Sequence, residues 1–232
     1  MTSLAKNWLA VQSRIQRACE RAGRDPATVQ LLAVSKTFPA EAVVAVAHAG
    51  QRDFGENYIQ EGVAKITALA SDARTAGLVW HCIGPIQSNK TRAVAEHFDW
   101  AHTVDRFKIA QRLDAQRPHT LAPLNVCIQV NTDGGATKSG VAPHEALALA
   151  REIAALPRLR LRGLMTIPDP VDGFDAQLAL HQHAKHLFDD MQAALALPHF
   201  DTLSMGMSAD LEAAVQAGST LVRIGTAIFG QR

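Results

Sequence analysis

The feature that most constrains the fold of this sequence is an alternation of short apolar runs with longer helix-like stretches. Eight apolar or β-branched runs recur, at 31–35, 52–55, 78–84, 101–104, 124–131, 161–167, 202–205 and 221–225. Helix-like stretches lie between them, at 40–49, 58–73, 89–97, 107–116, 143–155, 174–197 and 209–217. Near-continuous apolar runs are typical of strands in a parallel sheet that is buried on both faces. Their alternation with helices favours a parallel α/β fold.

Eight strand–helix units predict a closed (β/α)8 TIM barrel rather than an open doubly wound sheet. Only a few residues follow the last run, so the helix that should cover it is missing. We expect the amphipathic segment 1–24 to form an N-terminal helix that caps this face instead. Its apolar side chains are Leu4, Trp8, Leu9, Val11 and Ile15. No linker or change of composition divides the chain, and we therefore expect one domain over residues 1–232.

The composition excludes several classes of protein. Hydrophobic residues make up 47% and charged residues 19% of the chain, which excludes a disordered protein. A net charge of +1 and 5% aromatic residues argue against a nucleic-acid binder. No apolar run is long enough to span a membrane. Cys19, Cys82 and Cys127 are too far apart for a disulfide framework or a zinc motif, and we expect a reducing, cytoplasmic compartment.

Lys36 is the sharpest candidate for chemistry, because it closes the first apolar run. Active sites of TIM barrels form at the carboxyl ends of the strands. Burial there lowers the pKa of an amine and makes it nucleophilic, and such an amine forms Schiff bases with carbonyl compounds. The alternative is a surface lysine that lies just beyond the strand and keeps its ammonium in water.

The last two loops of the barrel resemble a phosphate site. Ser208 is a suitable N-cap for a helix that begins at Ala209, and the first turn of such a helix attracts anions. Gly225 and Thr226 add a close backbone approach and a hydroxyl group. Barrels often bind phosphate in the loops after strands 7 and 8. The alternative is that these residues only cap a helix and shape turns.

Arg223 lies inside the last apolar run and needs a buried partner, because an unpaired buried charge is very costly. That partner is either a carboxylate of the barrel or a heteroatom of a ligand. The histidines of segment 174–197, His181, His183 and His186, point in three directions on a helix. We therefore expect solvated histidines there and no metal site.

Six stretches of the sequence, taken together, resemble the pyridoxal phosphate homeostasis proteins, which are related to the N-terminal barrel of alanine racemase. They are AVSKT at 33–37, FGENY at 54–58, HCIGPIQSNK at 81–90, GLM at 163–165, LSMGMSAD at 203–210 and VRIGTAIFG at 222–230. The resemblance implies a barrel like the N-terminal domain of alanine racemase that binds pyridoxal 5′-phosphate. Two departures from the family pattern, Cys82 and a short tail after Gly230, are expected to lie away from the site.

The resemblance also implies roles for individual residues. Lys36 would hold the cofactor as a Schiff base, Asn57 would contact its ring, and Arg223 would approach the pyridine nitrogen. Lys138 would be a second contact for a B6 vitamer.

At the phosphate of the cofactor, the resemblance implies contacts from Ser208, Gly225 and Thr226, with the backbone of Met207 assisting. An arginine at the pyridine nitrogen leaves that nitrogen unprotonated, whereas a carboxylate would keep it protonated and the ring strongly electron-withdrawing. The racemases that share this arginine use a second base, a tyrosine from another domain. This chain has a single tyrosine, Tyr58, and we expect no second domain.

We therefore expect a binding protein for vitamin B6 homeostasis that holds pyridoxal phosphate reversibly, passes it to apo-enzymes and has little or no turnover. One alternative is a weak amino-acid racemase, which would need His81 or Cys82 as its second base. The other is a Schiff-base aldolase without a cofactor, which would need Lys36 but no phosphate site. The expected partners are pyridoxal phosphate, other vitamers and apo-enzymes, with neither nucleic acid nor membrane, and the expected state is a monomer.

Overall fold

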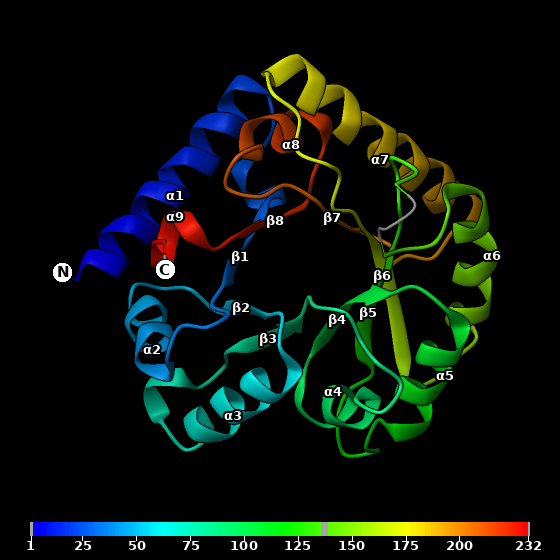
Figure 1. Cartoon of the computed structure of the whole chain (residues 1–232), viewed down its shortest axis with the longest axis horizontal. Helices are drawn as coiled ribbons and strands as arrows, with labels where there is room; N and C mark the ends of the chain where they lie inside the picture. The colour runs from blue at the N-terminus through cyan, green and yellow to red at the C-terminus, as the bar shows by residue number, and fades with distance from the viewer. Residues whose placement is uncertain (1, 136–138, 232) are drawn as a thin grey trace.

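Eight parallel strands form a closed barrel in the computed structural model, which describes residues 2–135 and 139–231 (Figure 1). The strands are β1 (Gln30–Val34), β2 (Asp53–Glu56), β3 (Val79–Cys82), β4 (Trp100–Val104), β5 (Leu124–Gln129), β6 (Leu159–Met165), β7 (Thr202–Ser204) and β8 (Leu221–Ile224). Each strand pairs with the next in chain order, and β8 pairs with β1. The predicted (β/α)8 barrel is thus confirmed.

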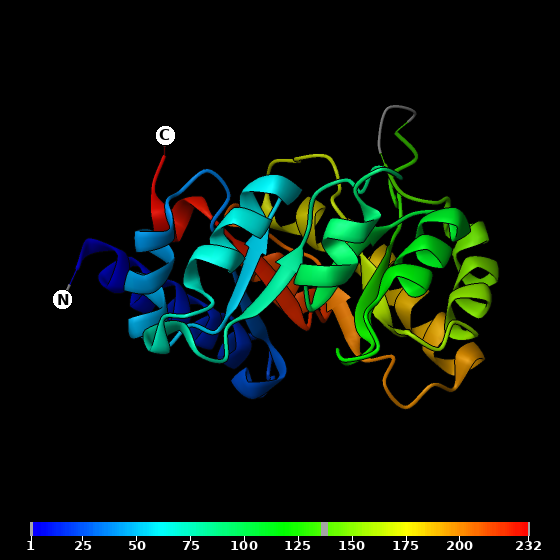
Figure 2. The same cartoon turned by 90° about the horizontal axis from the view of Figure 1, so that it is seen from below.

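Helices follow the strands and form the outer layer of the barrel, as the perpendicular view shows (Figure 2). They are α1 (Ser3–Arg21), α2 (Ala40–His48), α3 (Ile59–Leu69), α4 (Thr91–His97), α5 (Phe107–Gln116), α6 (Pro143–Ala154), α7 (Phe174–Leu195), α8 (Leu211–Ala217) and α9 (Thr226–Phe229). The short 3₁₀ turns Pro26–Thr28 and Ala73–Thr75 precede β1 and β3. Among the described residues, no helix has the length and apolar content that a membrane crossing requires.

The N-terminal helix α1 lies in the outer layer of the barrel, as expected, and packs on α2, α8 and α9. Arg14 of α1 forms an ion pair with Glu212 of α8 at 2.5 Å, and the side-chain amide of Asn7 donates to the carbonyl of Ile228 at 3.0 Å. Two details differ from the sequence-based expectation. The final strand is followed by a helix of its own, the single-turn α9, and Leu9 is 43% exposed rather than part of the buried face.

Alternation along the strands decides which side chains enter the barrel. On β8, Val222 and Ile224 belong to the large apolar core between barrel and helices, whereas Leu221 belongs to a separate small cluster with Leu32, Val34 and Ile83. Successive side chains on a strand point to opposite faces, so Arg223 points inward with Leu221. The barrel interior therefore contains the guanidinium group of Arg223, which is 5% exposed.

Candidate functional site

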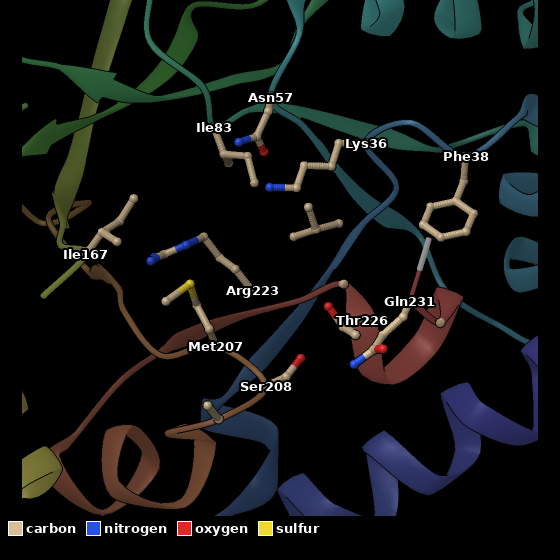
Figure 3. A pocket seen from close by; sticks show the side chains of 14 residues that line it. Lys36, Phe38, Asn57, Ile83, Ile167, Met207, Ser208, Arg223, Thr226 and Gln231 are labelled. Atoms are coloured by element: carbon tan, nitrogen blue, oxygen red, sulfur yellow. The ribbon is translucent and has the colours of Figure 1, made fainter. Parts of the chain in front are cut away.

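A cavity of about 810 Å³ opens at the carboxyl ends of β1, β2, β3, β7 and β8 (Figure 3). This volume lies in the usual range for small-molecule sites. All seven residues that the sequence predicts for the site line this cavity: Lys36, Asn57, Met207, Ser208, Arg223, Gly225 and Thr226. The structure thus brings the seven residues together from the carboxyl ends of β1, β2, β7 and β8.

Lys36 lies in the turn after β1 and reaches into the cavity (Figure 3). The residue is half-buried rather than enclosed, so its amine is accessible from the cavity. The next residue, Thr37, has a φ of 64°, a conformation that is uncommon for residues other than glycine. Its backbone N–H donates to the carboxylate of Glu61, which helps to hold this backbone conformation. Strained backbone of this kind concentrates at functional sites.

A buried ion pair between Lys65 and Glu56 contacts the backbone next to Lys36 and holds this turn in place. Lys65 of α3 donates from Nζ to Glu56 Oε1 at 2.8 Å and to the carbonyl oxygen of Ser35 at 2.7 Å. The Ser35 hydroxyl donates to the same carboxylate oxygen at 2.6 Å. Burial raises the pKa of Glu56, and its Oε2 has no hydrogen-bond partner among the described residues. Sequence analysis missed this network, because a lysine within an ordinary helix pattern gives no sign of its buried partner.

Replacing Lys65 with methionine is expected to destabilise the protein by about 3–5 kcal/mol, because Glu56 would be left buried without its cation. The free energy of unfolding from urea titrations measures this effect. Lys185→Met is the matched control, because Lys185 pairs with Asp189 on the exposed side of α7. Exposed pairs contribute about 1 kcal/mol or less, so equal losses in the two variants would contradict the structural role of Lys65.

The hydroxyl groups of Ser208 and Thr226 lie at one end of the cavity, and Gln231 lies beside them (Figure 3). The prediction that Ser208 caps a helix starting at Ala209 is wrong. Helix α8 begins at Leu211, and Asp210 is its N-cap residue. Ser208 lies in the preceding turn, so its hydroxyl is not engaged in capping α8.

Asp210 holds this turn in place from the inside. Its Oδ1 accepts a hydrogen bond from the backbone N–H of Met207 at 2.6 Å, and its Oδ2 contacts Nε2 of His181 at 2.9 Å. Burial opposes the charge of Asp210, but these hydrogen bonds dominate and lower its pKa. The expectation of solvated histidines on α7 is wrong for His181, which is 1% exposed. On the other side, Arg14 donates to the carbonyl of Ser208 at 2.7 Å.

The guanidinium group of Arg223 has two neutral partners. Nη1 donates to the hydroxyl of Ser204 at 2.8 Å, and Nη2 donates to the carbonyl oxygen of Thr166 at 2.8 Å. Neither of these partners is the barrel carboxylate that the sequence left open. Burial lowers the pKa of Arg223 to about 10, while Asp210 acts in the opposite direction. The arginine thus remains a cation at neutral pH and faces the cavity.

Asn57 carries an unsatisfied group at the cavity wall. Its Oδ1 is buried and has no hydrogen-bond partner among the described residues. Such a group is costly unless a ligand or water completes it. The amide can be turned by 180° and so can present either its oxygen or its NH₂ group.

Gly84 fixes the position of Asn57 from below. A Cβ atom on Gly84 would lie 1.9 Å from the backbone oxygen of Asn57, so Gly84→Ala must push Asn57 away. We expect a loss of about 1–3 kcal/mol in unfolding free energy, as for other overpacked sites, together with weaker ligand binding. Gly77→Ala is the control for ligand affinity: its φ of 79° makes an alanine there strained as well, but no atom lies within 4 Å of the added Cβ and Gly77 does not line the cavity. Unchanged ligand affinity in Gly84→Ala would show that Asn57 does not need this position.

The chain matches the family model for the N-terminal domain of alanine racemase over residues 7–232. It belongs to this family. Two relatives named pyridoxal phosphate homeostasis protein are 55% identical, from Vibrio cholerae, and 57% identical, from Pseudomonas aeruginosa. Each match covers 100% of this chain, and 98% and 97% of the respective relatives. The structure of PipY from Synechococcus elongatus with PLP bound is 35% identical, with a TM-score of 0.84, and the match covers 98% of this chain and 100% of that one.

Sequence analysis missed several residues that line the cavity. Phe38, Ile83 and Ile167 form apolar walls of the cavity. Gly230 and Gln231 also line it, so the expectation that the tail after Gly230 lies away from the site is wrong. Helix α9 turns the chain back toward the cavity, which a sequence pattern of four residues could not reveal. The proposed second vitamer contact, Lys138, lies outside the described residues.

The two candidates for a second catalytic base, His81 and Cys82, are both fully buried and do not line the cavity. Both ring nitrogens of His81 have partners, Asp53 Oδ1 at 3.1 Å and His102 Nε2 at 2.9 Å. Burial raises the pKa of Cys82 to about 12, so its thiol remains protonated at neutral pH. Neither side chain is placed to take a proton from a ligand in the cavity.

The charges around the cavity are all of one sign. Lys36 and Arg223 are its cationic residues, and no acidic side chain lines it among the described residues. The other polar side chains of the lining are uncharged: the hydroxyl groups of Ser208 and Thr226 and the amides of Asn57 and Gln231. The cavity thus suits an anionic ligand that carries a group reactive toward an amine.

Proposed function

We propose that this protein binds pyridoxal 5′-phosphate in the cavity and holds it reversibly through a Schiff base on Lys36. The observation that carries the proposal is the combination in one cavity of a lysine amine, two hydroxyl groups and a buried arginine, with no lining carboxylate among the described residues. An aldehyde with a phosphate group matches this arrangement at both ends. The PipY structure with PLP bound and the relatives named pyridoxal phosphate homeostasis protein support the same ligand.

Each part of the cavity has a defined task in this proposal. The hydroxyl groups of Ser208 and Thr226 donate hydrogen bonds to phosphate oxygens, and Gly225 allows the backbone to approach the phosphate closely. Arg223 donates a hydrogen bond to the pyridine nitrogen. The side-chain amide of Asn57, whose Oδ1 has no other partner among the described residues, forms a hydrogen bond to the ring of the cofactor. The cofactor supplies an electrophilic aldehyde and an electron-withdrawing ring. Met207 contacts the ligand by packing, because its backbone N–H is already bonded to Asp210.

The function that follows is storage and delivery of the cofactor within vitamin B6 homeostasis. A half-buried Lys36 in an open cavity allows the Schiff base to form and to hydrolyse, which storage requires. Other B6 vitamers that share the phosphate are further candidate ligands, and pyridoxal phosphate-dependent apo-enzymes are the proposed recipients. The free, buried cysteines Cys19, Cys82 and Cys127 support a reducing, cytoplasmic compartment. We propose that residues 1–232 act as one binding domain and as a monomer.

Transfer of the cofactor tests this function directly. The loaded protein is mixed with an apo-enzyme, and the rate at which activity returns is compared with the rate at which the loaded protein releases cofactor to a small-molecule trap. Reactivation faster than release supports delivery by direct transfer. Reactivation at the release rate would leave storage alone, and no retention of pyridoxal phosphate would contradict the proposal altogether.

We expect little or no amino-acid turnover by the loaded protein. No second base lines the cavity opposite Lys36 among the described residues, and the exposed Tyr58 is not part of its lining. The measurement is exchange of the α-hydrogen of alanine for deuterium by nuclear magnetic resonance. Exchange or racemisation that disappears in Lys36→Ala would instead support the alternative, a weak racemase.

A further inference from the structure

A continuous line of polar side chains crosses the interior of the barrel below the cavity. From Arg223 Nη1 the contacts run to Ser204 Oγ at 2.8 Å and from Ser204 Oγ to His102 Nδ1 at 3.0 Å. They continue from His102 Nε2 to His81 Nδ1 at 2.9 Å and from His81 Nε2 to Asp53 Oδ1 at 3.1 Å. Asp53 is the first residue of β2, so the line ends at the opposite end of the barrel from the cavity. We call these five residues the barrel chain.

The two ends of the barrel chain favour one direction for the hydrogen bonds between them. Arginine can only donate, so the Ser204 oxygen accepts from Arg223, and its own hydroxyl can donate to His102 Nδ1. A carboxylate can only accept, so His81 donates from Nε2 to Asp53. Both requirements are met when each imidazole is neutral and carries its proton on Nε2. In that state His102 donates from Nε2 to His81 Nδ1, and each of the four contacts in the barrel chain pairs one donor with one acceptor.

Burial favours this single arrangement. His81, His102 and Ser204 are all 0% exposed. Burial lowers the pKa of His102 well below its usual value, with the cation of Arg223 contributing, so its ring carries one proton at neutral pH. The opposite direction with neutral rings would point a lone pair of His81 at the carboxylate of Asp53. Such a repulsive contact between a lone pair and a carboxylate costs more free energy in a buried site than in water.

Apolar and aromatic side chains surround the barrel chain and restrict its geometry. The Trp100 ring stacks on His81 with centroids 5.2 Å apart and lies 5.7 Å from the His102 ring. Arg162 lies over the Trp100 ring, with its guanidinium carbon 4.6 Å from the ring centre. Arg162 in turn forms an ion pair with Asp201 at 2.8 Å. The barrel chain thus packs against fixed neighbours, and Asp53 is its most exposed residue.

We propose that Asp53 is a positioning residue for Arg223, on which it acts through His81, His102 and Ser204. The carboxylate fixes the tautomers of both histidines, which turns the Ser204 oxygen toward Arg223 as an acceptor. The Thr166 carbonyl holds the other terminal nitrogen, and together these acceptors set the plane of the guanidinium at the cavity. The effect on the bound cofactor rests on the proposed function, whereas the effect on the guanidinium does not.

A buried polar network can also serve stability alone, and the two roles predict different results. If the network only stabilises the fold, any variant of Asp53 should change the unfolding free energy without a specific change at Arg223. If Asp53 directs the barrel chain, the hydrogen-bond acceptor at its position matters more than the charge. Asparagine can keep that acceptor through its amide oxygen, and leucine cannot.

The first test uses nuclear magnetic resonance on the protein without cofactor, and so does not depend on the proposed function. Nitrogen-15 shifts of His81 and His102 should report a proton on Nε2 in both rings of the wild type. In Asp53→Leu, the Nδ1-protonated form of His81 should appear and the guanidinium N–H signals of Arg223 should shift. Asp53→Asn should resemble the wild type. Asp25→Asn is the control, because it removes an exposed carboxylate before β1.

A proton on Nδ1 of His102 in the wild type would overturn the inference, even if Asp53→Leu fails to fold. Unshifted Arg223 signals in a folded Asp53→Leu variant would overturn it as well. A second test follows the absorption maximum of bound pyridoxal phosphate, which should shift in Asp53→Leu and in Ser204→Ala but not in Asp53→Asn. If the protein binds no pyridoxal phosphate while the tautomers and the Arg223 signals behave as expected, the proposed function fails and the inference about Asp53 stands.

Discussion

Replacing Lys36 with alanine is expected to abolish covalent retention of pyridoxal phosphate. Lys36 is the only lysine among the described residues that line the cavity, so no neighbouring amine can replace it there. The loaded protein is reduced with borohydride, digested and mapped by mass spectrometry. The wild type should give a single pyridoxyl-labelled peptide containing Lys36, and Lys36→Ala should give none. The yellow colour of the loaded protein should be lost in parallel.

Lys108→Ala is the matched control for this experiment. Lys108 is an exposed lysine on α5, far from the cavity lining, so its loss should leave labelling of Lys36 unchanged. Label on another peptide in the wild type would contradict the assignment of Lys36. A colourless protein that still binds pyridoxal phosphate tightly would contradict the Schiff base but preserve the cavity as a binding site.

The double variant Ser208→Ala/Thr226→Ala is expected to weaken binding of pyridoxal phosphate by about 100-fold or more. Each hydroxyl would donate to a charged phosphate oxygen, a hydrogen bond that contributes about 1.5–3 kcal/mol. Tenfold in affinity corresponds to about 1.4 kcal/mol, so two such bonds reach this factor. Equilibrium titration of the unloaded protein, followed by absorbance, measures the dissociation constant.

Pyridoxal without its phosphate provides the discriminating comparison for the double variant. Its affinity should change little, because it makes no contact with either hydroxyl. Ser13→Ala, on the exposed side of α1, controls for loss of a serine as such. Equal weakening for pyridoxal and pyridoxal phosphate would contradict the phosphate assignment and indicate a general disturbance of the cavity.

The location of the site follows from local sequence information, whereas the buried polar networks that hold its residues in place do not. Lys36, Asn57 and Thr226 follow strand-like runs, and parallel strands deliver such positions to one end of a barrel, where Arg223 of the last run also lies. The Lys65–Glu56 pair and the barrel chain were not predicted. The barrel chain joins residues that are distant in sequence, and the Lys65–Glu56 pair joins a helix to a strand. Each partner alone looks like an ordinary polar residue in a helix or strand.

The boundary of α8 illustrates the same limit on a smaller scale. Ser208 followed by an apolar helix pattern favours a start at Ala209, because serine is a common N-cap. In the folded protein Asp210 binds the Met207 N–H and His181, and the helix starts two residues later. The contact with His181 comes from α7, which no local pattern around Ser208 contains.

The sequence by itself determined the barrel, because burial of a parallel sheet on both faces leaves a repeated local pattern of apolar runs and helices. It also brought the seven predicted residues to one end of the barrel, since the order of strands fixes which loops meet. The tertiary structure alone decided which polar groups inside the barrel satisfy one another. That choice depends on distances across the barrel, and it links Arg223 at the cavity to Asp53 at the other end.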